Sequence, residues 1–181
     1  MDKYELTSET LQYAGHTLHR IKALKDFGSI KAGELGGWVE KEENLSQYGN
    51  AWVYGDAWVY GDARVHGDAR VHGNAEVYDN AWVYGNAWVY DDARVCGDAE
   101  VRGNARVCGD ADYIVFKNFW SSGRYFTWTR SNNKWCVGCF HGTGEELIKK
   151  AYSDSEISGR EYERVVRYVE GILADEKKRS N

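Results

Sequence analysis

Eleven consecutive hexapeptides run from Gly49 to Ile114 without an inserted or deleted residue. Their consensus is Gly-Asp/Asn-Ala-x-Val-y, as in GDAWVY, GDARVH and GNAEVY. A period of six residues matches neither an α-helix nor a simple hairpin, and it is typical of a parallel β-helix in which each hexad forms one short side and one corner. Three hexads close one coil, so each residue n is expected to stack on residue n+18. The repeats therefore predict about four coils.

The alternation of side chains along a strand divides each hexad into core and surface positions. Val and Ala lie two residues apart, so both are expected to point inward, and Gly at the corner tolerates the positive φ of a tight bend. The x and y positions then face outward, and they are rich in Trp, Tyr, Arg and His. Stacked rungs let such side chains stabilise one another by cation–π contacts, but exposed aromatic and Arg patches also mark binding surfaces. The candidate partner-binding residues are Trp52, Tyr54, Trp58, Tyr60, Arg70, Trp82, Tyr84, Trp88, Tyr90 and Arg106.

The coil is expected to lie between two other parts. Residues 1–48 are predicted to form an N-terminal β cap, because the end of a solenoid leaves unpaired strand edges that need cover. Leu45 and Val39 are expected to continue its core in degenerate repeats. Residues 49–112 form the β-helix, and residues 113–181 form a C-terminal α+β module. The fold class is therefore mainly β.

The C-terminal module is expected to contain a three-stranded sheet and two helices. The strand candidates are YIVFKNFW, RYFTWTR and KWCVGCF, separated by turn-forming residues. The first helix is expected to begin after Thr143, which forms a capping box with Glu146. The second is expected to begin after Ser158, which has the same spacing to Glu161.

The module also differs from the coil in charge. Residues 113–181 contain twelve basic and nine acidic residues (+3), whereas residues 49–112 contain five and eleven (−6), within a total of −5. A basic sheet rich in aromatics can be laid against nucleic acid, although an ordinary α+β cap would bury the same aromatics in its core. The candidates for DNA contact are Arg124, Trp128, Arg130 and Lys134.

Neither a metal nor a cofactor is expected. Cys136 and Cys139, followed by His141, have the spacing of half a zinc site, but no second cluster has ligand spacing. The chain contains no P-loop, no GxGxxG and no serine elbow. The start MDKYELTSET is not that of a signal peptide, and no stretch approaches the length of a membrane span, so a cytoplasmic location is expected.

Residues 49–114 resemble the left-handed parallel β-helix of hexapeptide-repeat acyltransferases. The resemblance implies a left-handed coil, and it raises an acyl-CoA-dependent acyltransferase as an alternative function. That family uses a histidine general base, usually on or near an extruded loop at a subunit boundary, and generally forms trimers. The repeats here have no extruded loop, and His66 and His72 occupy ordinary y positions with no evident orienting partner. The expectation is therefore that the chain is not an enzyme.

The whole chain resembles small hexapeptide-repeat proteins of phages and prophages of gut Firmicutes. The resemblance is carried by HRIKALKDFG, LGGWVEKEENLS, the GNAWVYG repeats and DYIVFKNFWSSGRYFTWTR. It implies a non-catalytic phage-encoded binding protein that inhibits a host defence nuclease, namely an anti-CRISPR acting on Cas9, with DNA contact through the C-terminal module. A homo-oligomer, either a dimer or a trimer, belongs to this expectation. A structural phage protein is a further alternative.

Overall fold

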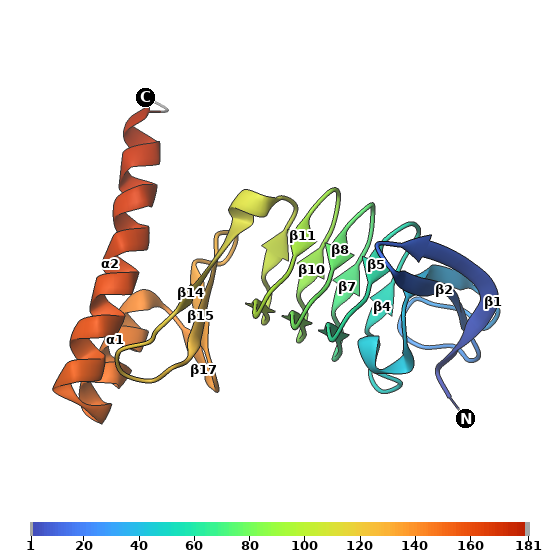
Figure 1. The fold of residues 1–181 in the computed structure, drawn as a ribbon, viewed down its shortest axis with the longest axis horizontal. Helices are drawn as coiled ribbons and strands as arrows, with labels where there is room; N and C mark the ends of the chain where they lie inside the picture. Colours follow the sequence, from blue (N-terminus) through green and yellow to red (C-terminus); the bar gives the residue numbers. More distant parts are fainter. Residues whose placement is uncertain (1, 180–181) are drawn as a thin grey trace. The chain divides into compact units, whose positions relative to one another are not determined.

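The computed structural model describes residues 2–179, which divide into two compact units (Figure 1). Unit 1 comprises the residues up to Tyr113 together with Thr129–Asn132, and unit 2 comprises Ile114–Trp128 and the residues from Asn133 onward. The segment Thr129–Asn132 belongs to unit 1 because its polar groups bond there: the Arg130 N–H donates to a carbonyl at the end of the coil, 2.8 Å away.

The N-terminal cap consists of a β-hairpin and one strand that enters the coil. The strands are β1 (Tyr4–Tyr13), β2 (His16–Ala23) and β3 (Leu35–Val39), followed by the short 3-10 helix η1 (Glu42–Asn44). Ala14 and Gly15 join β1 to β2 with φ of 49° and 90°, the left-handed conformations of a two-residue hairpin turn. The strand β3 pairs antiparallel with β2 and parallel with the first rungs of the coil.

The coil is built from ten two-residue strands in three parallel sheets, as the hexapeptide period predicts. The registers join Val59 to Val77 and Val77 to Val95, which confirms the stacking interval of 18 residues. One sheet continues the cap in the order β3-β5-β8-β11, and the others have the orders β13-β10-β7-β4 and β12-β9-β6. The strands are β4 (Trp52–Val53), β5 (Trp58–Val59), β6 (Arg64–Val65), β7 (Arg70–Val71), β8 (Glu76–Val77), β9 (Trp82–Val83), β10 (Trp88–Val89), β11 (Arg94–Val95), β12 (Glu100–Val101) and β13 (Arg106–Val107).

The core of the coil consists of the repeated Val and Ala side chains, which are buried from Ala51 to Val107 as expected. Val39 and Leu45 are also fully buried and extend this core into the cap, which confirms their predicted positions. The pattern of buried Val and Ala side chains ends one hexad before the sequence repeat ends. Ala111 is exposed, because the chain leaves the coil at the short 3-10 helix η2 (Asp110–Asp112).

Unit 2 contains a four-stranded sheet, one strand more than the sequence predicts. Its order is β14 (Tyr113–Lys117), β15 (Tyr125–Thr129), β16 (Lys134–Val137) and β17 (Phe140–Gly142). The expected third strand is broken at Gly138, whose φ of 56° allows a tight turn, so that Val137 pairs with Phe140 across a hairpin. The sequence KWCVGCF therefore supplies two strands instead of one.

Two helices follow the sheet, as predicted, and residues of both share a buried core with it. The helix α1 (Gly144–Asp154) has the expected capping box, in which the Thr143 hydroxyl accepts from the Glu146 N–H. The helix α2 (Glu156–Arg179) begins earlier than expected, because the Ser155 hydroxyl accepts from the Ser158 N–H at 3.1 Å. No helix within residues 2–179 is long and apolar enough to cross a membrane. The buried core of unit 2 comprises Phe126, Trp128, Trp135, Val137, Leu147, Ile148, Ala151, Tyr162, Val166 and Val169.

Candidate functional site

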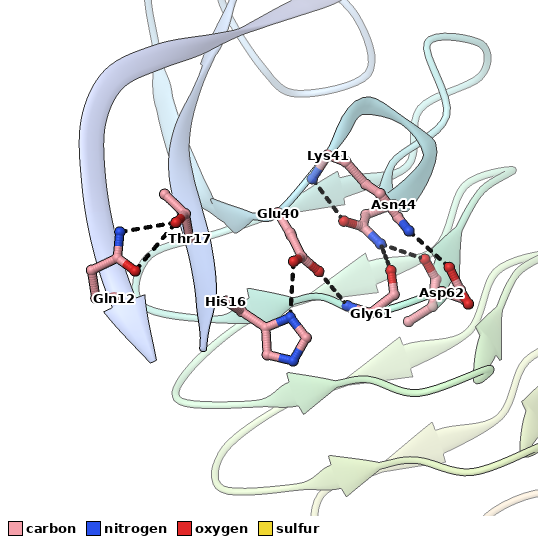
Figure 2. A network of polar contacts seen from close by, with 9 residues as sticks. Gln12, His16, Thr17, Glu40, Lys41, Asn44, Gly61 and Asp62 are labelled. Carbon is pink, nitrogen blue, oxygen red and sulfur yellow. Dashed lines mark hydrogen bonds and ion pairs between the residues drawn. The ribbon is translucent and has the colours of Figure 1, made fainter. Parts of the chain in front are cut away.

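A histidine and a glutamate meet where the β1–β2 hairpin covers the first rungs of the coil (Figure 2). The Nδ1 atom of His16 lies 2.8 Å from Oε1 of Glu40. The second carboxylate oxygen, Oε2, accepts a hydrogen bond of 2.8 Å from the Gly61 N–H. Both oxygens of Glu40 are therefore held in place, one by the coil and one by the imidazole. We call this pair the His16–Glu40 dyad.

Local backbone geometry places both members of the dyad. The tight turn at Ala14 and Gly15 starts β2 at His16, directly opposite Tyr13. Glu40 follows β3, and its N–H donates to the carbonyl of Val59 at 3.1 Å, so the first rung of the coil fixes its backbone. A residue of the hairpin and a residue of the coil entrance are thereby brought together across 24 positions of sequence.

The electrostatics of the site favour an ionised glutamate. Partial burial raises the pKa of Glu40, but the hydrogen bonds from His16 and from the Gly61 N–H outweigh it, and the net pKa lies below the ordinary value. In the neutral tautomer whose Nδ1–H donates to this carboxylate, the lone pair lies on Nε2 of His16. Among residues 2–179, no hydrogen bond engages Nε2. This is the arrangement of an oriented general base.

One tyrosine packs on the imidazole, and a second tyrosine packs on the first. The Tyr60 ring lies 5.0 Å from the His16 ring, and its hydroxyl donates to Oε2 of Glu76 at 3.2 Å. Burial and the neighbouring Glu76 raise the pKa of Tyr60, so its hydroxyl stays protonated at neutral pH. The Tyr13 ring contacts Tyr60 and also Trp58, the latter at 4.7 Å. Through these ring contacts, the dyad is linked to the outer surface of the coil around Trp58.

That surface contains a pocket of about 360 Å³, within the size range of small-molecule sites. Its wall residue Trp58 contacts Tyr13, which in turn contacts the Tyr60 ring beside His16. We call it the Trp38–Trp58 pocket. It is lined by Leu11, Trp38, Asp56, Trp58, Asn74 and Glu76.

Charged groups of the cap and the coil surround this pocket. The Arg20 guanidinium lies 5.1 Å from the Trp38 ring centroid and donates to the Gly55 carbonyl at 3.1 Å. Oε1 of Glu76 lies 3.4 Å from Nε of Arg94. The pocket therefore combines aromatic walls with polar groups that are already fixed in position, which is the usual composition of a ligand site.

Most of the predicted partner-binding residues form ladders on the outside of the coil. The guanidinium groups of Arg70 and Arg106 each lie 5.1 Å from the Trp88 ring, one from the rung on either side, which confirms the expected cation–π stacking. Trp58 lines the pocket described above. The remaining residues that reach the outer surface are Tyr54, Trp82, Tyr84 and Tyr90.

Two predicted ladder residues are not available to a partner. Trp52 is 0% exposed, because Tyr4 and Phe27 of the cap pack on its ring at 6.1 and 5.3 Å. Tyr60 is also buried, by the hairpin tip. The prediction that these two positions face solvent is therefore wrong. The cap covers the first coil on its outer side, whereas the repeat alone describes a bare coil.

The predicted DNA-contact residues do not share one environment. Trp128 lies in the core of unit 2, and its Nε1 donates to Asn133 at 2.9 Å, so its prediction as a contact residue is wrong. Nε of Arg130 donates to the Ala111 carbonyl. Nζ of Lys134 lies 4.0 Å from a carboxylate oxygen of α1, and Arg124 is exposed.

The histidines that the repeat presents lack the features of His16. His66 stacks on Tyr84 at 4.8 Å, and His72 stacks on Tyr90 at 5.3 Å. Burial lowers the pKa of both, and their rings serve the ladders. The sequence alone does not single out His16, because no motif links it to Glu40; the one local signal is Gly15 just before it, a turn-forming residue. Within residues 2–179, no three His, Cys, Asp or Glu side chains are grouped to hold a metal ion.

Comparison with known proteins supports the repeat architecture and changes the functional reading. A family model described as YdcK Beta solenoid repeat matches residues 57–73 and 75–91. The chain is also similar to the Uncharacterized acetyltransferase YdcK of Escherichia coli (strain K12), with 34% identity over 61 residues. That match covers 29% of this chain and 19% of the relative, so the chain spans about a fifth of the length of the curated protein it matches.

These findings contradict the expectation of a non-catalytic anti-CRISPR protein that inhibits Cas9. They also contradict the expectation that the chain is not an enzyme, because the matched relative carries the name of an acetyltransferase. They favour the acyltransferase alternative instead. What the matches and the structure establish together is the architecture: the chain is a β-helix repeat protein whose repeats match those of the YdcK solenoid.

Proposed function

We propose that this chain is an acyltransferase in which His16 is the general base and Glu40 orients it. The observation that carries the proposal is the 2.8 Å contact between Nδ1 of His16 and a carboxylate whose other oxygen is fixed by Gly61. A carboxylate on Nδ1 holds the imidazole in the tautomer that accepts a proton at Nε2. The name of the E. coli relative supports acyl transfer as the reaction class.

In the proposed acyl transfer, His16 first accepts a proton and then donates it. Nε2 of His16 removes the proton from a hydroxyl or amine of the acceptor while the acceptor atom attacks the carbonyl carbon of a thioester such as acetyl-CoA. The new C–O or C–N bond forms as the C–S bond breaks. The proton on Nε2 then passes to the departing sulfur, which leaves as a thiol. Glu40 stabilises the imidazolium between these steps and is not consumed.

The Trp38–Trp58 pocket binds the acceptor in this proposal. Its two indoles offer flat apolar walls, and Asn74 and Asp56 offer hydrogen-bonding groups to a polar acceptor. Three ring contacts link the pocket to the base, from Trp58 to Tyr13, from Tyr13 to Tyr60 and from Tyr60 to the imidazole. His16 does not line the pocket, so in this proposal the acceptor extends beyond the pocket to reach Nε2. Loss of a pocket wall should then weaken acceptor binding more than it slows the chemical step.

The test is product formation by the purified full chain. Acetyl-CoA is incubated with a panel of hydroxyl and amine acceptors, thiol release is followed by absorbance, and the acetylated product is identified by mass spectrometry. The proposal expects turnover with at least one acceptor class, and a raised KM with little change in kcat for Trp58→Ala. Thiol release that never exceeds the rate without protein, across the whole panel, would contradict the proposal.

A further inference from the structure

Three large aromatic side chains of unit 2 lie mostly in solvent. Phe119 is 72% exposed, Trp120 is 75% exposed and Tyr168 of α2 is 60% exposed. Exposed aromatic residues gathered in one place usually mark an interaction surface. Phe119 and Trp120 are sequence neighbours whose rings lie 6.0 Å apart, and Tyr168 lines the same pocket as Trp120. We call this surface the Phe119–Trp120 face.

The loop that presents Phe119 and Trp120 is closed by its own hydrogen bonds. Oδ1 of the buried Asn118 accepts from the N–H groups of Trp120 and Ser121, at 3.0 and 3.1 Å. Nδ2 of Asn118 donates to the Ser121 hydroxyl at 2.7 Å. The next residue, Ser122, accepts from the Tyr162 hydroxyl of α2 at 2.9 Å, which ties the loop to the helix. The two aromatics are therefore held outward by an ordered turn, so little conformational entropy is lost when they bind.

A hollow lies beside these protruding rings on the same face. It has a volume of about 200 Å³, and Phe116, Trp120, Val165 and Tyr168 contribute to its apolar lining. The rings of Phe116 and Tyr168 meet edge to face at 5.9 Å. The face thus carries both a protrusion and a hollow of aromatic character.

The charges of the face are also of both signs. Nζ of Lys117 donates to the Tyr125 hydroxyl at 3.1 Å and lies 4.6 Å from the Tyr125 ring. Among the residues that the structure describes, no carboxylate pairs with Lys117. Glu161 and Arg164 line the same hollow as Lys117, and the Glu161 carboxylate accepts a hydrogen bond of 2.6 Å from the Arg164 guanidinium.

We propose that this face binds the same face of a second copy of the chain about a two-fold axis. A two-fold interface requires a surface that is complementary to itself, with a protrusion and a hollow side by side and with charges of both signs. The Phe119–Trp120 face meets both requirements. In the dimer, the Phe119–Trp120 loop of each copy enters the hollow of the other copy, and Lys117 of each copy faces Glu161 of the other. The proposal concerns unit 2 and does not depend on acyl transfer by unit 1.

The test is the molar mass of the full chain in solution. Size exclusion with light scattering and sedimentation velocity are run over a range of protein concentrations for the wild type, Trp120→Ala, Lys117→Glu and the control Tyr48→Ala, which truncates an exposed tyrosine of unit 1. Far-ultraviolet circular dichroism and the melting temperature establish that each variant is folded.

The proposal predicts a wild-type dimer whose dissociation constant rises about thirtyfold or more in Trp120→Ala, as expected for an aromatic anchor. Lys117→Glu raises it as well, and Tyr48→Ala leaves it unchanged. A chain that stays monomeric at every concentration would overturn the proposal. So would a dimer or trimer whose mass is the same in the wild type and in folded Trp120→Ala, because such an assembly uses another surface.

Discussion

Nδ1 of His16 and Oε1 of Glu40 lie 2.8 Å apart although the two residues come from different structural contexts, one from a hairpin tip and one from the entrance of the coil. The contact exists because β1 and β2 continue the sheet that β3 shares with the coil, and the tip of their hairpin packs on Trp58 and Tyr60. The cap therefore covers the end of the solenoid and also contributes His16 to the dyad. The cap brings the His16 imidazole to the outer face of the coil, where ring contacts through Tyr60 and Tyr13 link it to the Trp38–Trp58 pocket.

Glu40→Gln should remove part of the acid sensitivity of unit 1. The pKa of Glu40 is lowered in the folded state, so its ionised form stabilises the fold above the unfolded pKa, and this contribution is lost as the pH falls through the folded value. At pH 7 we expect the variant to be less stable by about 1 kcal/mol, the usual net value of one hydrogen bond. Urea unfolding between pH 7 and pH 3 measures the effect. Glu9→Gln, at an exposed position of β1, is the control, and equal pH dependence of Glu40→Gln and the wild type would refute the assignment.

Lys3 should make the stability of unit 1 rise under mildly alkaline conditions. Burial, and then the nearby charge of Lys25, lower the pKa of Lys3 to about 8. Between this value and the ordinary value of 10.5, the unfolded chain holds a proton that the folded chain releases, so the free energy of unfolding increases with pH. From pH 8 to 9.5 we expect a gain of about 1.5 kcal/mol from this group.

The comparison variant for this effect is Lys3→Met, whose stability should not show the gain. The substitution keeps an unbranched apolar chain between the rings of Tyr4 and Phe27, and it loses the hydrogen bond from Nζ to the Ala51 carbonyl. Lys31→Met, at an exposed site of the same unit, should behave like the wild type. Denaturant unfolding at each pH gives the answer. A parallel rise in Lys3→Met and the wild type would show that another group is responsible.

Trp52→Ala and Trp82→Ala should differ in their effect on stability, although both residues occupy the same position of the repeat. Trp52 is fully enclosed by Tyr4 and Phe27, so its removal leaves a cavity and should cost about 3–5 kcal/mol. Trp82 is 40% exposed and stacks with Arg64, so its loss should cost about 0.5–1 kcal/mol. Thermal unfolding of both variants decides this. Equal losses would mean that the cap does not cover Trp52 in solution.

Alanine substitutions at two corner glycines distinguish the cost of a left-handed backbone from the cost of crowding between neighbouring coils. Gly55 and Gly73 both have positive φ, at 56° and 74°. A methyl group on Gly55 would meet no atom within 4 Å, whereas one on Gly73 would lie 2.8 Å from the backbone nitrogen of Asp91 in the next coil. Gly55→Ala should therefore cost about 1–2 kcal/mol from the left-handed backbone alone.

Gly73→Ala should cost at least about 1 kcal/mol more than Gly55→Ala, because the backbone of the next coil must also move. The difference in the midpoint of urea unfolding between the two variants measures the closeness of the coils. If Gly55→Ala proves as damaging as Gly73→Ala, the corner at Gly55 is more crowded than the structure indicates.

The coil could be predicted from the sequence because its determinants are local and repeat. Each Val lies inside because side chains alternate along a strand, and the interval between Val59 and Val77 follows from the six-residue period with three hexads to a coil. The same logic fails at Trp52, because its burial depends on Tyr4 and Phe27, which belong to the cap and follow no repeat. It fails at Gly138 for a different reason. The segment KWCVGCF has the composition of one strand, but the positive φ of Gly138 makes a turn in its middle.

The dyad lay beyond prediction for the same physical reason as the burial of Trp52. His16 and Glu40 share no motif, and their contact depends on the packing of the hairpin onto the coil. The sequence drew attention to His66 and His72 because they stand in the repeat, where neighbouring rungs give them aromatic partners instead of a carboxylate. A repeated position favours a structural role, whereas the His16–Glu40 dyad lies in the cap, before the first hexapeptide.

The most direct measurement is the steady-state rate of thiol release from acetyl-CoA, at saturating acceptor, for the wild type, His16→Gln and His19→Gln. His19 lies on the same strand and bonds the Thr7 carbonyl, so it is a matched control outside the dyad. If His16 is the general base, His16→Gln loses about 10²–10⁴-fold in kcat while His19→Gln stays close to the wild type. Equal rates in folded His16→Gln and the wild type would contradict the assignment of His16 as the base.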